Sequence, residues 1–318
     1  MFLHVTSGTN DIEWDYDIDT IRTVNFAESS GIVSAVLHQV PNQPIVFNPI
    51  DGVPGQDLIY ANGRTEDGII ARCWRMFIDN YNDGLIDHGV LVQNAMAKSA
   101  VRGLDTITEF VYNKTGNYPL RAGVTGASKR GWTTWLTAAV DYERVTFMAP
   151  VFFDELNMVE NIHQHYRSLG GYTYAFFDYY YAGITEYLDS DAVQESLKVL
   201  DVLTFKDRYG KFQTNYMINA GNDEFFLLGN PKYFFHHLSP KTLLRVLPNQ
   251  GHGGIGGGVD AGEGELDGLW TSIEAIFTAS LWNPELIPVI STKHTDTSEY
   301  VILFVLSSIM EKISDIRQ

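Results

Sequence analysis

Three side chains of this sequence are of the types that together carry out acyl transfer. The stretch RAGVTGASKRGW carries Ser128, NAGNDEFF carries Asp223, and LLRVLPNQGHGG carries His252. A serine hydroxyl becomes a good nucleophile when a base takes its proton, and a neutral imidazole can take that proton and later give it to the leaving group. A carboxylate on the other ring nitrogen would fix the tautomer of the imidazole and stabilise its charged form. We therefore expect Ser128, His252 and Asp223 to be catalytic.

The segment around Ser128 has the pattern of a strand, a tight turn and a helix. The small residues Gly126, Ala127 and Gly131 suit the strained turn of a nucleophile elbow, where strand and helix backbones cross closely. Arg130 stands where the pattern G-x-S-x-G has its second glycine, so we expect its side chain to point outward. The alternative is that Ser128 only caps the helix, which would contribute about 1 kcal/mol.

Asp223 and His252 each follow a predicted strand at its carboxyl end. The chain order serine, acid, histidine is that of α/β-hydrolases, in which such residues meet at one edge of a parallel sheet. Two other carboxylates stay open as the acid. Glu224 is next to Asp223, and Asp154 follows another predicted strand.

The negative oxygen of a tetrahedral intermediate requires preorganised hydrogen-bond donors. We expect these donors to be the backbone N–H of Lys129 and one from the loop TSGTN, through Gly8 or Thr9. No cofactor is expected. A zinc site is rejected because His163 and His165, two positions apart, do not share one helix face.

The elements that must position these residues alternate between short β-branched runs and helical patterns. This alternation predicts a mainly parallel sheet with helices on both faces. Residues 155–209 form an aromatic-rich insertion that reads as a helical cap, and we expect Phe177, Tyr180 and Tyr181 in it to bind substrate, with packing against the core as the alternative. Strands are expected at 2–6, 32–38, 120–125, 144–151, 214–220 and 242–248, and helices at 18–29, 65–79, 94–112, 129–141, 231–238 and 264–281.

Composition limits the partners of the chain. With 318 residues, 45% of them hydrophobic, the chain can bury a substantial core. A net charge of -17 argues against binding nucleic acid, because phosphate binding requires clustered Lys and Arg. The apolar run 300–310 is too short to span a bilayer, so no membrane insertion is expected. A small-molecule or peptide substrate fits best, and the oligomeric state stays open.

Longer stretches also carry a family resemblance. VTGASKRGWTTWLTAAVD, together with QVPNQP and NAGNDEFF in the same order, resembles the PhoPQ-activated pathogenicity-related protein family over about residues 1–282. The resemblance implies an α/β-hydrolase fold, carries the triad onto Ser128, Asp223 and His252, and accounts for Arg130. Members tend to be secreted or periplasmic. No signal peptide is expected in this chain, which is expected to begin at the third strand of the fold, with the strands before it missing. The segment 283–318 is expected to be a divergent C-terminal tail.

These patterns together predict a serine hydrolase that cleaves an ester or peptide-like bond through an acyl-enzyme. For a peptidase, Glu155 and Glu160 are candidates for binding a peptide terminus. The alternative from another class is a secreted signalling or binding protein that keeps a hydrolase scaffold.

Overall fold

In the part of the chain that the structure describes, six short strands pair into one sheet, and each of these pairings is parallel. The computed structural model describes residues 1–10, 17–47, 60–209, 213–255 and 263–287. Each strand lies within or close to the range predicted for it, and the spatial order is β2-β1-β3-β4-β5-β6. The strands are β1 (Phe2–Val5), β2 (Ser34–Leu37), β3 (Ala122–Ala127), β4 (Val145–Val151), β5 (Thr214–Ala220) and β6 (Thr242–Leu247).

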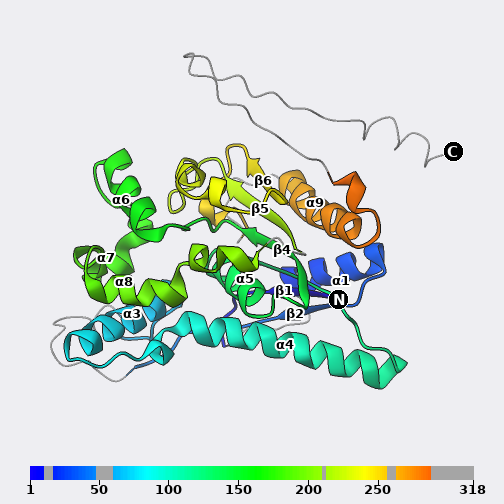
Figure 1. Cartoon of the computed structure of the whole chain (residues 1–318), viewed down its shortest axis with the longest axis horizontal. Coiled ribbons are helices and arrows are strands. Elements are labelled where there is room, and N and C mark those ends of the chain that lie inside the picture. Colours follow the sequence, from blue (N-terminus) through cyan, green and yellow to red (C-terminus); the bar gives the residue numbers. More distant parts are fainter. Residues whose placement is uncertain (11–16, 48–59, 210–212, 256–262, 288–318) are drawn as a thin grey trace, which may run out of the picture.

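Helices cover both faces of this sheet (Figure 1). Successive side chains of a strand point to opposite faces. Leu3 and Val5 therefore join the core under α4 and α5, while Phe2 stacks on Phe26 of α1 and contacts Phe277 of α9. The covering helices are α1 (Ile18–Ser30), α4 (Val92–Thr115), α5 (Lys129–Val140) and α9 (Glu263–Trp282), whereas α3 (Glu66–Asn82) packs on α4 and on helices of the segment between β4 and β5.

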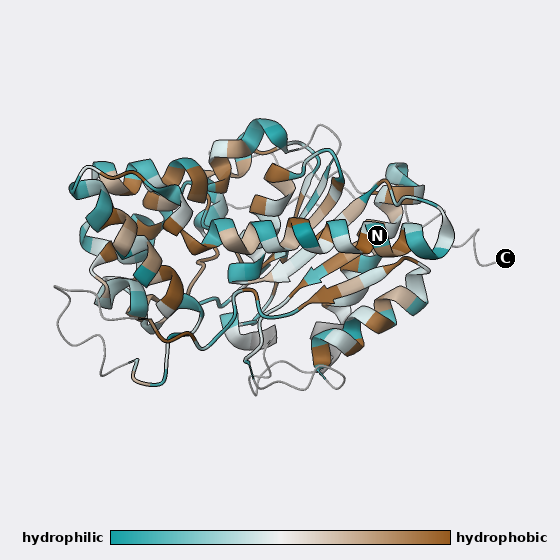
Figure 2. Cartoon of the chain, turned by 90° about the horizontal axis from the view of Figure 1, so that it is seen from below, coloured by the Kyte–Doolittle hydropathy of each residue, from teal (hydrophilic) through white to brown (hydrophobic). Residues whose placement is uncertain are grey.

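Between β4 and β5 the described residues form helices joined by loops, as the aromatic-rich insertion predicts. The α-helices are α6 (Met158–Leu169), α7 (Phe177–Tyr181) and α8 (Asp191–Leu200), and three 3-10 helices lie at Tyr174–Phe176, Ile184–Glu186 and Val202–Arg208. Of these helices, α7 and α8 pack on α3, and with α6 they lie at one end of the molecule (Figure 1). Hydrophilic and hydrophobic residues are both present along these helices, as expected where one face covers a core (Figure 2).

One predicted helix is wrong in type. Residues 231–238 form two 3-10 helices, Asn230–Tyr233 and Phe235–His237, in place of one α-helix. The backbone of Phe234 between them has φ −143° and ψ −24°, which interrupts the helical path.

The far C-terminal segment lies outside the described residues from 288 onward, including the apolar run 300–310. The division into a domain at 1–282 and a tail at 283–318 therefore stays a prediction. None of the helices in the described ranges combines the length and the hydrophobicity that crossing a bilayer requires.

Candidate active site

Ser128 lies at the junction between β3 and α5 with a left-handed backbone, φ 57°. This φ is uncommon for a residue other than glycine and is typical of strained functional turns. The Ser128 side chain makes no capping hydrogen bond to α5, and its Oγ lies 2.8 Å from Nε2 of His252. The structure therefore does not support the helix-cap interpretation.

Two glycines allow the strand and the helix to cross at this turn. A Cβ on Gly126 would lie 2.7 Å from the Cβ of Arg130 and 2.8 Å from the carbonyl oxygen of Val5. A Cβ on Gly131 would lie 2.8 Å from the Cβ of Phe153. These approaches are closer than side chains tolerate, which explains the small residues of the sequence pattern.

Arg130 corrects one expectation, because its side chain is buried and does not point outward. It is 7% exposed, and its guanidinium pairs with Glu66 in the first turn of α3. Burial lowers the pKa of Arg130 to about 10. The sequence could not show this, because Glu66 approaches from a helix 64 positions earlier in the chain.

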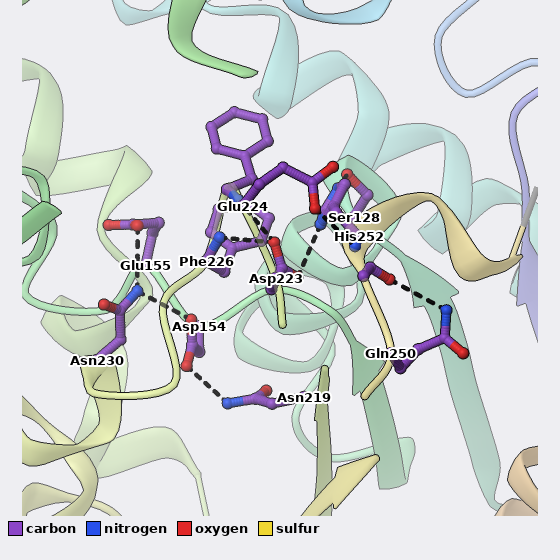
Figure 3. A network of polar contacts seen from close by, with 12 residues as sticks. Ser128, Asp154, Glu155, Asn219, Asp223, Glu224, Phe226, Asn230, Gln250 and His252 are labelled. Atoms are coloured by element: carbon purple, nitrogen blue, oxygen red, sulfur yellow. Dashed lines mark hydrogen bonds and ion pairs between the residues drawn. The ribbon is translucent and has the colours of Figure 1, made fainter. Parts of the chain in front are cut away.

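His252 is held between the serine and a carboxylate (Figure 3). Its Nδ1 lies 2.9 Å from Oδ2 of Asp223, and Oδ1 of Asp223 accepts the backbone N–H groups of Phe225 and Phe226, each at 2.8 Å. The rings of the two phenylalanines meet the imidazole edge to face, at 5.5 and 5.1 Å between centroids. The structure thus joins the three predicted residues in one chain of hydrogen bonds.

The two alternative carboxylates have other partners. Oε2 of Glu224 accepts the backbone N–H of His252 at 3.1 Å. Burial alone would raise the pKa of Glu224, but hydrogen bonds from the Tyr174 hydroxyl and from the His252 backbone lower it below its usual value. Neither contact places Glu224 on the imidazole ring.

Asp154 is fully buried away from the histidine. Its carboxylate oxygens accept from the side-chain amides of Asn219, at 2.6 Å, and Asn230, at 3.1 Å (Figure 3). Burial raises the pKa of Asp154 to about 8. Asp154 therefore fits the sequence pattern expected of the acid, but it has no contact with the imidazole.

A cavity of about 400 Å³ opens onto Ser128 and His252. From the loop after β1 it is lined by Thr6 and Ser7, whereas the predicted oxyanion residues Gly8 and Thr9 are not among its lining residues. Gly8 has φ 122°. The role of Gly8, Thr9 and the backbone N–H of Lys129 in an oxyanion hole stays a prediction.

A second, smaller cavity of about 40 Å³ is lined mainly by aromatic and aliphatic side chains. Lys129 and Phe225 line both cavities, so the two are adjacent. The aromatic residues around the smaller cavity are Trp74, Trp132, Phe153, Phe176, Tyr179, Phe225 and Phe226.

The residues expected to bind substrate in the insertion are not at either cavity. Phe177 and Tyr180 are 48% and 64% exposed, and Tyr181 contacts Phe177 and lies near Tyr60. The aromatic side chains of the insertion that line the smaller cavity are Phe176 and Tyr179, three positions apart in the chain. The aromatic run predicts rings in this region, but the face of the helix that turns inward is set by packing on α3 and could not be predicted from the run itself.

The side chain of Lys129 was missed by the sequence interpretation, which used only its backbone N–H. Its ammonium group lies 3.2 Å from Oγ of Ser128 and is 3% exposed. The signal available was a cationic residue directly after the nucleophile. Among the described residues, no cluster of three or more His, Cys, Asp or Glu side chains could hold a metal ion.

Residues 2–264 match the family described as PhoPQ-activated pathogenicity-related protein. The chain belongs to this family. This PhoPQ-related chain is also 35% identical over 263 residues to the Autocrine proliferation repressor protein A of Dictyostelium discoideum, across 81% of this chain and 49% of that protein. It thus spans about half the length of that relative.

Solved structures resemble the fold of this PhoPQ-related protein. An acetyl xylan esterase from Paenibacillus sp. R4 superposes with a TM-score of 0.50 at 16% identity, covering 86% of this chain and 73% of that one. Acetyl Xylan Esterase 1 from Thermoanaerobacterium sp. JW/SL YS485 gives a TM-score of 0.48 at 17% identity, covering 87% and 74%. The parallel sheet with helices on both faces has the α/β-hydrolase fold that the sequence predicts.

Proposed function

We propose that this protein is a serine hydrolase that cleaves an ester or peptide-like bond through an acyl-enzyme. The observation that carries the proposal is the continuous chain of hydrogen bonds from Ser128 through His252 to Asp223, at the edge of a cavity. A serine, a base within hydrogen-bond distance and a third group that orients the base are the geometric requirements of nucleophilic catalysis.

The steps follow from the atoms in contact. Nε2 of His252 takes the proton of Ser128 while Oγ attacks the carbonyl carbon, and the carbonyl electrons move to the oxygen. Collapse of the intermediate expels the leaving group, which receives the proton from His252. A water molecule then repeats the sequence on the acyl-enzyme. Asp223 keeps Nδ1 of His252 protonated and orients the ring.

The two cavities suggest where the parts of a substrate bind. The larger cavity around Ser128 has both polar and apolar walls and suits the leaving group, while the small aromatic-walled cavity suits a short apolar acyl group. On p-nitrophenyl esters we expect kcat/KM to fall when the acyl chain becomes longer than the small cavity accepts. Rates that rise steadily up to long chains would contradict this assignment of the small cavity.

The direct test is labelling with a fluorophosphonate, which reacts with activated serines. Wild type should be labelled, while Ser128→Ala and His252→Ala, each shown to be folded by circular dichroism, should not. A folded wild type that takes no label, or a Ser128→Ala protein that keeps full turnover, would overturn the proposal.

A second candidate function rests on the relative named as a proliferation repressor. In that case the protein acts as a signalling or binding protein through its surface, on a hydrolase scaffold. A proliferation assay with wild type and Ser128→Ala separates the two. An effect that the variant retains in full supports the binding function, and one that is lost with the serine supports the enzyme.

A further inference from the structure

A buried ammonium group lies beside the proposed nucleophile, and the acyl-transfer steps above leave it without a role. Lys129 directly follows Ser128, and its Nζ lies 3.2 Å from Oγ, while His252 approaches the same oxygen through Nε2. Oγ therefore has two neighbours, an imidazole that can accept its proton and a cation that can only donate a hydrogen bond.

Two contacts hold this ammonium group in place. Oδ2 of Asp67, in the first turn of α3, lies 3.0 Å from Nζ. Oδ1 of the same carboxylate accepts the hydroxyl of Tyr179 at 2.7 Å, so α7 fixes Asp67 in turn. The ammonium also lies over the ring of Phe225, 4.0 Å from its centroid. A cation with these partners is preorganised, because it need not reorient when charge appears next to it.

Its position matches the place where negative charge develops. When Oγ bonds to the carbonyl carbon, the carbonyl oxygen becomes an oxyanion within a few ångströms of Oγ, and Lys129 lines both cavities that meet there. With only 3% of its side chain exposed, the ammonium is little screened by water. An ordinary surface lysine would contribute far less.

We propose that the side-chain ammonium of Lys129 is a further catalytic group, which stabilises the negative charge of the tetrahedral intermediate by hydrogen bonding. The inference rests on the proposed serine hydrolase function. In the step, the proton of Ser128 passes to Nε2 of His252, the carbonyl electrons move to oxygen, and Lys129 keeps its proton. Its side chain thus adds to the backbone donors of the oxyanion hole.

The first variant is Lys129→Met, which keeps much of the length of the side chain and removes the charge. Loss of one preorganised donor typically costs about 10²–10³ in kcat. We expect a fall in kcat of about 100-fold with KM changed less than about 3-fold, because the group acts on the intermediate more than on bound substrate. The rate of fluorophosphonate labelling should fall in parallel.

Removing Lys129 also leaves the Asp67 carboxylate, which is 20% exposed, without its cation, and this alone could lower activity by loosening α3. The double variant Lys129→Met/Asp67→Asn removes both charges and keeps an acceptor for Tyr179. We expect it to regain thermal stability relative to the single variant but not kcat. The matched control is Lys198→Met on α8, which pairs with Glu195 outside both cavities and should leave kcat unchanged.

The outcomes separate this inference from the proposed function. A wild type that takes no label fails the hydrolase proposal itself. A labelled wild type with Lys129→Met retaining kcat within about 3-fold overturns the role of Lys129 while leaving the hydrolase intact. A double variant that regains wild-type kcat also overturns it, because Lys129 would then serve only to neutralise Asp67.

Discussion

Two Asp–Glu pairs follow neighbouring strands of the sheet. Their sequence context is similar, but their contacts in the structure differ. Asp154 and Asp223 each stand three positions after the last residue of their strand, β4 and β5, and each is followed by a glutamate. Phenylalanines flank both pairs, before Asp154 and after Glu224. Residue type and distance from the strand therefore do not distinguish them as the acid of a triad.

The partners of the two pairs distinguish them. The Asp223 carboxylate meets His252 and two backbone N–H groups, and Glu224 holds the backbone of the same histidine. Asp154 accepts from the side-chain amides of Asn219 and Asn230, and Glu155 beside it accepts from Asn230 at 3.2 Å. Burial raises the pKa of Asp154 to about 8 and that of Glu155 well above its usual value. One pair contacts the candidate site, while the other is buried in the core, where burial favours the protonated form of both carboxyl groups.

The strongest test of this comparison replaces each aspartate in turn with the neutral asparagine. Asp223→Asn keeps the shape of the side chain but favours the wrong tautomer of His252, so turnover should fall by about 10⁴-fold. Asp154→Asn should leave kcat within about 3-fold, because Asp154 does not contact the imidazole. Initial rates on an ester substrate at pH 7 measure both. If Asp154→Asn caused the larger loss, the acid would be assigned to the wrong strand.

The comparison also shows which features of the fold and of the site could be predicted from the sequence. The alternation of strands and helices and the order of Ser128, Asp223 and His252 are properties of local pattern, and they predicted the fold and the residues that meet. The choice of Asp223 over Asp154 depends on where the loop after β6 places His252. The burial of Arg130 likewise depends on Glu66, and the ammonium of Lys129 on Asp67, partners that lie far away in the chain.

The second prediction concerns how stability depends on pH. In the unfolded chain Asp154 loses its proton near pH 4, whereas the folded chain keeps it to about pH 8. Between these values the folded state binds more protons, so the free energy of unfolding falls as pH rises, by about 1.4 kcal/mol per pH unit from this group.

Asp154→Asn should therefore flatten the decline of stability with pH. Urea unfolding at pH 5, 6, 7 and 8 gives the slope, with Glu160→Gln, an exposed carboxylate of α6, as the control that leaves it unchanged. A variant with the wild-type slope would show that Asp154 ionises normally in the folded protein. Burial would then not raise the pKa of Asp154, and this difference between the two pairs would be wrong.

The smallest expected effect concerns Glu224, which accepts a hydrogen bond from the His252 backbone and does not contact the imidazole ring. Its carboxylate accepts both the His252 backbone N–H and the Tyr174 hydroxyl. Glu224→Ala removes both contacts, and because a small displacement of a catalytic group slows the chemical step, we expect kcat/KM to fall by about 10-fold.

Tyr174→Phe is the matched control for Glu224→Ala, since it removes the hydroxyl and leaves the contact to the His252 backbone in place. We expect a loss of only about 2-fold, measured on the same ester. Equal losses in the two variants would mean that Tyr174, and not the hold on the histidine, accounts for the effect. Losses in the expected order would show that the two residues of this pair act at different places. Asp223 orients the imidazole ring, and Glu224 positions the loop that carries His252.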